Sequence, residues 1–218
     1  MGRLVLVDLD DTLIDRRSAV TAWAADFTAN HRLSPEAARV VAEALRERAR
    51  PETFAGLRDT LGLAESAAEL WSGYVAEIAS KVASSAEALV RLDLLRTAGW
   101  SVGVLTNGGS DIQRAKLAAA GVLGHVDTVC ISEEIGARKP DPQAFRAALS
   151  YCGFEPPGDV WMIGDDPVSD IAGANAAGLS TIWISAGAAW STPDVTPHHI
   201  AVTVVDAADY LLELSESA

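Results

Sequence analysis

The chain has 218 residues, of which 49% are hydrophobic, and a formal net charge of −13 at pH 7. This length suits one domain, or a core with a sizeable insertion. The acidity argues against a broad nucleic-acid or membrane-binding surface, since both need a basic face, but a local site can still bind a small anion. The chain has no apolar run of the roughly 20 residues that span a bilayer. Its first residues also lack the apolar length of a signal peptide, so we expect a cytoplasmic protein. We expect it to be a monomer or a homodimer.

Short apolar runs alternate with helical patterns along the chain. The first run, "RLVLVDL", is apolar on both faces, which is typical of a strand covered on two sides. Five later runs are similar: "WSVGVLTN", "VDTVCIS", "DVWMIGD", "STIWIS" and "AVTVVD". Helical patterns lie between them, at residues 110–120, 142–151, 170–177 and 207–214. The alternation predicts a parallel sheet with helices on both faces.

Residues 16–82 break this alternation, because they contain no convincing strand pattern. The stretch is rich in Ala, Arg, Glu and Leu, and helical breaks are expected near "NHRLSP", "ARPETF" and "LGLAES". Ser34, Pro35 and Glu36 have the pattern of an N-cap, a first-turn proline and a first-turn acid. We therefore predict an all-helical insertion after the first strand.

Three carboxylates, Asp8, Asp10 and Asp11, follow the first apolar run directly. Neighbouring negative charges repel, so each acid disfavours the ionisation of the next. Ligands of open parallel sheets bind beyond the carboxyl ends of the strands, which is where these acids lie. A hard divalent cation held through oxygen would relieve the repulsion.

Other predicted strands also end in polar groups, namely Thr106 and Asn107 after "VGVL" and Asp165 and Asp166 after "WMIG". The loop after "VDTVCIS" leads to Lys139, one of only three lysines against fourteen arginines. A compact ammonium can contact a phosphate and a carboxylate together. The fold should bring five of these residues to one rim that can hold both a cation and an anion: Asp8, Asp10, Thr106, Lys139 and Asp165.

The segments "DLDDT", "LTN", "RKPDPQAF" and "GDDPVSDIAGANAAG" resemble the four motifs of the haloacid dehalogenase-like hydrolases, in the order of that family. The resemblance implies an α/β fold, in which a Rossmann-like doubly wound parallel sheet forms the core and an all-helical cap domain is inserted after the first strand. The core would comprise residues 1–15 and 83–218, and the cap residues 16–82. The insertion resembles the cap of the subfamily that contains dehalogenases, phosphoglycolate phosphatases and nucleotidases.

The resemblance also implies catalytic roles. Asp8 would be the nucleophile that forms an aspartyl-phosphate. Asp10 would give a proton to the leaving alcohol and later take one from water. Thr106 and the backbone N–H of Asn107 would bind a phosphoryl oxygen, while Lys139 would neutralise developing charge and restrain Asp8.

The implied cofactor is Mg²⁺, bound by Asp8, Asp165 and the backbone carbonyl of Asp10. Asp166 would assist in binding Mg²⁺, and Asp170 would contact the residues that bind the ion rather than the ion itself. Simple helix N-capping is an equally good interpretation of Asp166 and Asp170.

Asp10 favours phosphoryl transfer, because an acid is useful when the leaving group is an alkoxide and is not needed for a halide. We therefore expect a phosphatase of a small phosphorylated metabolite. A phosphomutase or a haloacid dehalogenase of the same fold is the alternative. From a different class, a non-enzymatic phospho-switch or a binding module also stays open, although the order of Lys139 before Asp165 disfavours the switch.

The cap should set specificity by closing over the site. Arg16 is the candidate for binding a substrate anion, because it follows the first motif closely. Arg17, Arg58 and Phe54 are further candidates.

Overall fold

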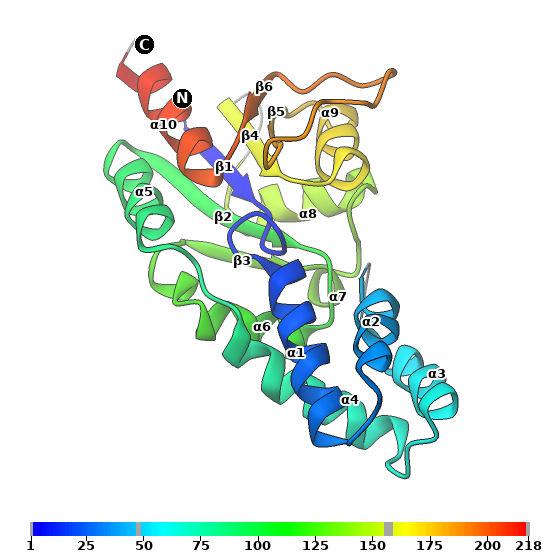
Figure 1. Cartoon of the computed structure of the whole chain (residues 1–218). Helices are drawn as coiled ribbons and strands as arrows, with labels where there is room; N and C mark the ends of the chain where they lie inside the picture. The colour runs from blue at the N-terminus through cyan, green and yellow to red at the C-terminus, as the bar shows by residue number, and fades with distance from the viewer. Residues whose placement is uncertain (1, 47–48, 155–158, 217–218) are drawn as a thin grey trace.

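The computed structural model describes residues 2–46, 49–154 and 159–216. Within these residues, six strands form one parallel sheet in the order β3-β2-β1-β4-β5-β6, with β1 in the interior (Figure 1). The strand bounds are β1 Arg3–Val7, β2 Trp100–Thr106, β3 Thr128–Ile131, β4 Asp159–Gly164, β5 Ser180–Ile184 and β6 His199–Ala201. The predicted parallel α/β fold is confirmed.

Both faces of the sheet are covered, as the continuous apolar character of β1 predicted. Val5 and Val7 point into one hydrophobic cluster, whereas Leu4 and Leu6 point into another, and all four are fully buried. The second cluster is built with helices α8 (Pro142–Tyr151) and α9 (Gly173–Ala176). The first is built with α5 (Ala86–Thr97), α6 (Ser110–Ala119) and α10 (Val204–Glu216).

The described part of residues 16–82 consists of helices joined by short loops and contains no strand, as predicted. It forms α1 (Arg16–Asn30), α2 (Pro35–Ala44), α3 (Pro51–Leu61), α4 (Ala67–Ile78) and the 3₁₀ turn η1 (Ala79–Lys81). Figure 1 shows these helices grouped beyond the end at which β1 finishes. Their interior is aromatic: Trp23 stacks on Phe27 and meets Tyr74 edge-on, with ring centroids 4.7 and 4.9 Å apart. The division into a core and a separate cap domain stays a prediction.

The prediction that "AVTVVD" is a strand was wrong for most of its length. Only Ala201 belongs to β6, and α10 begins at Val204. Thr203 Oγ1 accepts from the backbone N–H of Asp206 (3.2 Å), and an Asp206 carboxylate oxygen accepts from the backbone N–H of Thr203 (2.9 Å). This reciprocal capping box starts a helix and overrides the strand preference of the valines.

Helix α5 was missing from the sequence prediction. It begins after Ser85, whose hydroxyl accepts from the backbone N–H of Ala88. The other short elements are η2 (Val122–Gly124), α7 (Ser132–Ile135) and η3 (Pro167–Ala172), a π-helical turn. Among the helices formed by the described residues, none combines the length and apolar character needed to span a bilayer.

Candidate active site

The carboxyl ends of β1, β2 and β4 meet at one edge of the sheet, where polar residues follow all three strands. Asp8 follows β1, Thr106 ends β2 and Asp165 follows β4. The backbone N–H of Asp8 donates to the carbonyl of Ile163 (2.9 Å), which continues the strand pairing and fixes where the nucleophile candidate lies. These residues, with Asp10 and Lys139, line one cavity of about 530 Å³.

Lys139 reaches this edge from the loop between α7 and α8, and its side chain is buried. Its Nζ donates to Asp8 Oδ1 (2.6 Å) and to the carbonyl of Leu105 (2.7 Å). The side chain of Asn107 holds the backbone of Lys139 from both sides, because it donates to the carbonyl and accepts from the N–H (2.9 Å each). Asn107 therefore positions the lysine.

Asp170 is the third group beside the ammonium of Lys139. Its Oδ1 lies 2.7 Å from Lys139 Nζ and forms an ion pair with it. Gly164 makes room for this carboxylate, since a Cβ there would lie 2.2 Å from Asp170 Oδ2. Any side chain at Gly164, the glycine of the "GDD" segment, would therefore collide with Asp170.

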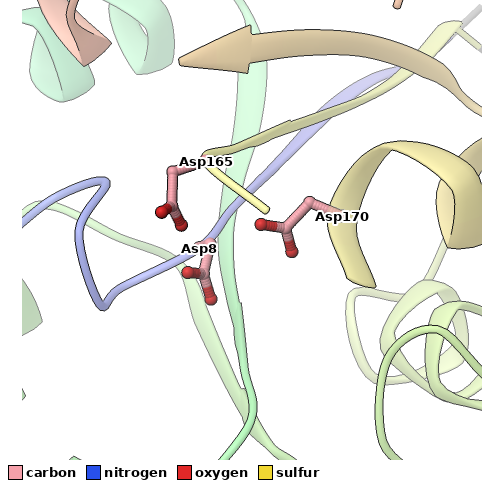
Figure 2. A group of neighbouring side chains, drawn as sticks. All are labelled: Asp8, Asp165 and Asp170. Atoms are coloured by element: carbon pink, nitrogen blue, oxygen red, sulfur yellow. The ribbon is translucent and has the colours of Figure 1, made fainter. Parts of the chain in front are cut away.

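Asp8, Asp165 and Asp170 form an acidic group in which one carboxylate oxygen from each lies within 4.8 Å of the others. Figure 2 shows the three carboxylates converging from the ends of β1 and β4 and from η3. Three carboxylate oxygens at this spacing fit a hard divalent cation such as Mg²⁺. Asp10 is not part of this group, so the structure adds Asp170 to the predicted ligands Asp8 and Asp165.

Burial is the main electrostatic feature of this group. It raises the pKa of Asp8 well above the ordinary carboxyl value, against the opposing attraction of Lys139, and it raises the pKa of Asp170 for the same reason. Burial, followed by repulsion from Asp170 and Asp11, raises the pKa of Asp165 to about 7. Burial would lower the pKa of Lys139, but Asp170 and Asp8 outweigh it, so this pKa lies above its ordinary value. The ammonium of Lys139 contacts two of these acids, Asp8 and Asp170, and the guanidinium of Arg17 pairs with the third, Asp165.

The side chain of Asp10 faces helix α6. Lys116 Nζ lies 2.7 and 3.0 Å from its two carboxylate oxygens, and Gln113 Nε2 donates to Oδ2 (3.1 Å). Gln113 Nε2 also lies 2.6 Å from the hydroxyl of Thr106 and so links the two predicted catalytic residues. The sequence analysis did not identify Lys116 and Gln113. Their spacing of three residues places both on one face of a helix that follows a motif strand, and this pattern could have indicated them.

Arg16 and Arg17 both line the cavity but have different partners. The guanidinium of Arg16 donates to the carbonyls of Leu45 and Arg46 (2.6 and 2.7 Å), just after α2 ends. These contacts give Arg16 a structural role. Its role in binding a substrate anion stays a prediction. Arg17 pairs with Asp165 (2.9 Å) and Asp11 (3.4 Å).

Two of the remaining candidates lie outside the cavity, and the third, Asp166, lines it. Arg58 pairs with Asp59 on the surface, and Phe54 is fully buried among aromatic rings, so neither lines the cavity. Asp166 accepts from the backbone N–H groups of Val168 and Ser169 (3.0 and 2.6 Å). These contacts are those of a helix N-cap, which was one of its two interpretations.

A family model for haloacid dehalogenase-like hydrolases matches residues 3–178. The chain belongs to this family. Among the solved structures that share the fold of this haloacid dehalogenase-like hydrolase is the L-2-haloacid dehalogenase from Xanthobacter autotrophicus. It aligns with a TM-score of 0.73 and 19% identity over 97% of this chain and 99% of that one.

The curated relatives include phosphatases. A phosphoserine phosphatase from Thermus thermophilus is 41% identical over 102 residues, which cover 47% of this chain and 41% of that protein. The pyrophosphatase PpaX from Bacillus velezensis is 31% identical over 191 residues, which cover 86% of this chain and 83% of that protein. The chain thus spans less than half the length of the first of these relatives.

Proposed function

We propose that this protein is a Mg²⁺-dependent phosphatase that hydrolyses a small phosphorylated metabolite through an aspartyl-phosphate on Asp8. One observation carries the proposal: the buried carboxylate of Asp8 is held by Lys139 beside Asp165 and Asp170, at the floor of a polar cavity. An ionised carboxylate with one oxygen fixed by an ammonium can present its other oxygen to phosphorus.

The first chemical step forms a bond between a carboxylate oxygen of Asp8 and phosphorus and breaks the bond from phosphorus to the leaving oxygen. Lys139 restrains Asp8 and offers positive charge to the phosphoryl group. In the second step water attacks phosphorus, the acyl phosphate bond breaks, and Asp8 returns as a carboxylate with release of inorganic phosphate.

Asp8, Asp165 and Asp170 are the side chains that would hold Mg²⁺, together with the backbone carbonyl of Asp10 that the family resemblance implies. The buried position of Asp170 beside Asp8 and Asp165 supports this assignment, since buried carboxylates at this spacing need nearby positive charge to stay ionised. When bound, the cation supplies positive charge against the phosphoryl oxygens and the carboxylates.

Asp10 is the proposed acid that protonates the leaving alkoxide and then accepts a proton from the attacking water. Lys116 and Gln113 orient its carboxylate, and Gln113 ties the same network to Thr106. A halide needs no such proton, so Asp10 favours phosphoester hydrolysis over dehalogenation. The names of the Thermus and Bacillus relatives agree with this choice.

The test is release of inorganic phosphate from p-nitrophenyl phosphate over many turnovers, with Mg²⁺ and with EDTA. We expect turnover with Mg²⁺ and its loss with EDTA or in Asp8→Asn. Asp194→Asn, an exposed acid outside the cavity, is the matched control and should keep the wild-type rate.

Three results would contradict the proposal. Chloride release from 2-chloropropionate without phosphatase activity would indicate a dehalogenase. A single stoichiometric phosphorylation that persists would indicate a phospho-switch. Wild-type turnover in homogeneous Asp8→Asn would remove Asp8 from the chemistry.

A further inference from the structure

The residues that line the active-site cavity are all polar or charged: aspartates, arginines, Thr106, Asn107, Lys139 and Ser169. Among the described residues, no aromatic or aliphatic side chain contributes to this lining. Ligand pockets of 300–1,000 Å³ are usually lined predominantly by apolar and aromatic groups, and this cavity of about 530 Å³ is not. Its described lining offers no aromatic ring on which a nucleobase could stack, so it suits a small and fully hydrophilic substrate.

Side chains of both charge signs line the cavity. The acids surround the end of the sheet, where the phosphate is proposed to react, whereas five arginines contribute to the same lining. Five of fourteen arginines in one cavity is a strong concentration for a chain of net charge −13. These arginines come from both parts of the chain: Arg16, Arg17, Arg46 and Arg50 from the helical insertion and Arg138 from the loop before Lys139.

Structural contacts account for three of the five guanidinium groups. Arg16 donates to the carbonyls after α2, Arg17 pairs with Asp11 and Asp165, and Arg46 pairs with Glu43 (3.4 Å). The guanidinium groups of Arg50 and Arg138 make no hydrogen bond or ion pair with any residue in the described ranges 2–46, 49–154 and 159–216; only the backbone carbonyls of these two residues accept hydrogen bonds. Both are exposed, so each can turn toward a ligand without breaking an existing contact.

We infer that Arg50 and Arg138 form a subsite for a second anionic group, and that the substrate is a small phosphomonoester carrying a carboxylate or a second phosphate. This inference rests on the proposed phosphatase function and narrows its substrate class. Planar guanidinium groups bind carboxylate and phosphate in a bidentate manner, which an ammonium cannot reproduce. Arg50 comes from the helical insertion and Arg138 from the loop between α7 and α8, so a doubly charged substrate would be contacted from both sides.

The test uses substrates that differ only in the second charge. 3-Phosphoglycerate has a carboxylate where glycerol 3-phosphate has a neutral CH₂OH group, and fructose 1,6-bisphosphate adds a phosphate to fructose 6-phosphate. We expect kcat/KM to be roughly tenfold or more higher for the doubly anionic member of at least one pair, as for one charge-assisted contact. The pair that shows the preference identifies whether the second group is a carboxylate or a phosphate.

Arg50→Gln and Arg138→Gln should each bring that ratio down toward one. Arg39→Gln is the matched control, because Arg39 is an exposed arginine on α2 outside the cavity lining, and it should keep the wild-type ratio. Phosphate release from both members of each pair at equal kcat/KM would overturn the inference and leave the phosphatase proposal intact.

Failure of the proposed function has a separate outcome. If no phosphate is released from any of these compounds or from p-nitrophenyl phosphate, the phosphatase proposal is wrong. Calorimetric titration of the wild-type protein with 3-phosphoglycerate, glycerol 3-phosphate and the two fructose phosphates then decides the inference by itself. Tighter binding of a doubly anionic compound that is lost in Arg50→Gln supports the subsite, and equal binding across each pair contradicts it.

Discussion

The ammonium of Lys139 lies 2.6 Å from Asp8 Oδ1, and both side chains are almost completely buried. The same ammonium lies 2.7 Å from Asp170, so one cation balances two buried acids. Removing one partner of a buried ion pair leaves an uncompensated charge, which costs about 3–5 kcal/mol. The lysine thus has a structural role as well as its proposed catalytic one.

Lys139→Met should therefore lower the free energy of unfolding by about 3–5 kcal/mol, measured by urea denaturation at pH 8. The loss should shrink toward pH 5, because burial raises the pKa values of Asp8 and Asp170 and both then take up protons. Lys81→Met is the control: Lys81 pairs with the exposed Asp26, and a pair of this kind is worth less than about 1 kcal/mol. Equal losses in the two variants would contradict this account.

Gly164 allows the carboxylate of Asp170 to approach the backbone, so Gly164→Ala should displace it. The added Cβ would lie 2.2 Å from Asp170 Oδ2, and overpacking of this kind costs about 1–3 kcal/mol. We also expect weaker Mg²⁺ binding by calorimetry, since Asp170 is a proposed ligand. Gly56→Ala is the matched control, because a Cβ there meets nothing within 4 Å inside α3, and the change should stabilise the protein by about 0.5–1 kcal/mol. A stable Gly164→Ala protein with unchanged Mg²⁺ affinity would show that the close contact has no consequence.

The positions of Asp8, Thr106 and Asp165 could be predicted because parallel strands end at the same edge of a sheet, so residues far apart in sequence converge there. The ion pair of Lys139 with Asp8 was expected from the family motifs. The placement of Asp170 in the acidic group was not, since it depends on the π-helical path of η3 and on the space above Gly164.

Packing between helices was the other feature that the sequence pattern could not reveal. Arg16 was a candidate for binding an anion, yet its guanidinium contacts the backbone just after α2, which is 29 residues away along the chain. Lys116 on α6 reaches Asp10, which is 106 residues away along the chain. Side-chain direction on a helix depends on how the helix docks, and periodicity alone does not fix it.

Mg²⁺ binding should depend on pH through Asp165. The pKa of this carboxyl is raised to about 7, so below pH 7 it holds a proton that the cation must displace. We expect the apparent Mg²⁺ affinity from calorimetry to fall by about fivefold from pH 7 to pH 6, and to change by less than about twofold between pH 7.5 and 8.5. A Mg²⁺ affinity that is constant from pH 6 to pH 8 would mean that the pKa of Asp165 lies outside this range or that Asp165 does not bind the cation.

Asp10→Asn should slow the hydrolysis of phosphate esters with poor leaving groups more than that of esters with good ones. Alkyl esters need a proton on the departing oxygen, whereas p-nitrophenolate leaves without one. We expect a loss on the order of 10²–10⁴ in kcat for alkyl phosphates, the usual contribution of a general acid, and a much smaller loss for p-nitrophenyl phosphate. Equal losses across a leaving-group series would contradict the acid role.

The most direct test of the account is to trap the phosphoryl group on Asp8. The protein is mixed with ³²P-labelled substrate and Mg²⁺, quenched in acid within one turnover, and digested for mass spectrometry. The account predicts up to one equivalent of label on the peptide that contains Asp8, its release by neutral hydroxylamine, which cleaves acyl phosphates, and its absence in Asp8→Asn. Turnover of the same substrate with no label on that peptide at any quench time, or with label on another residue, would contradict it.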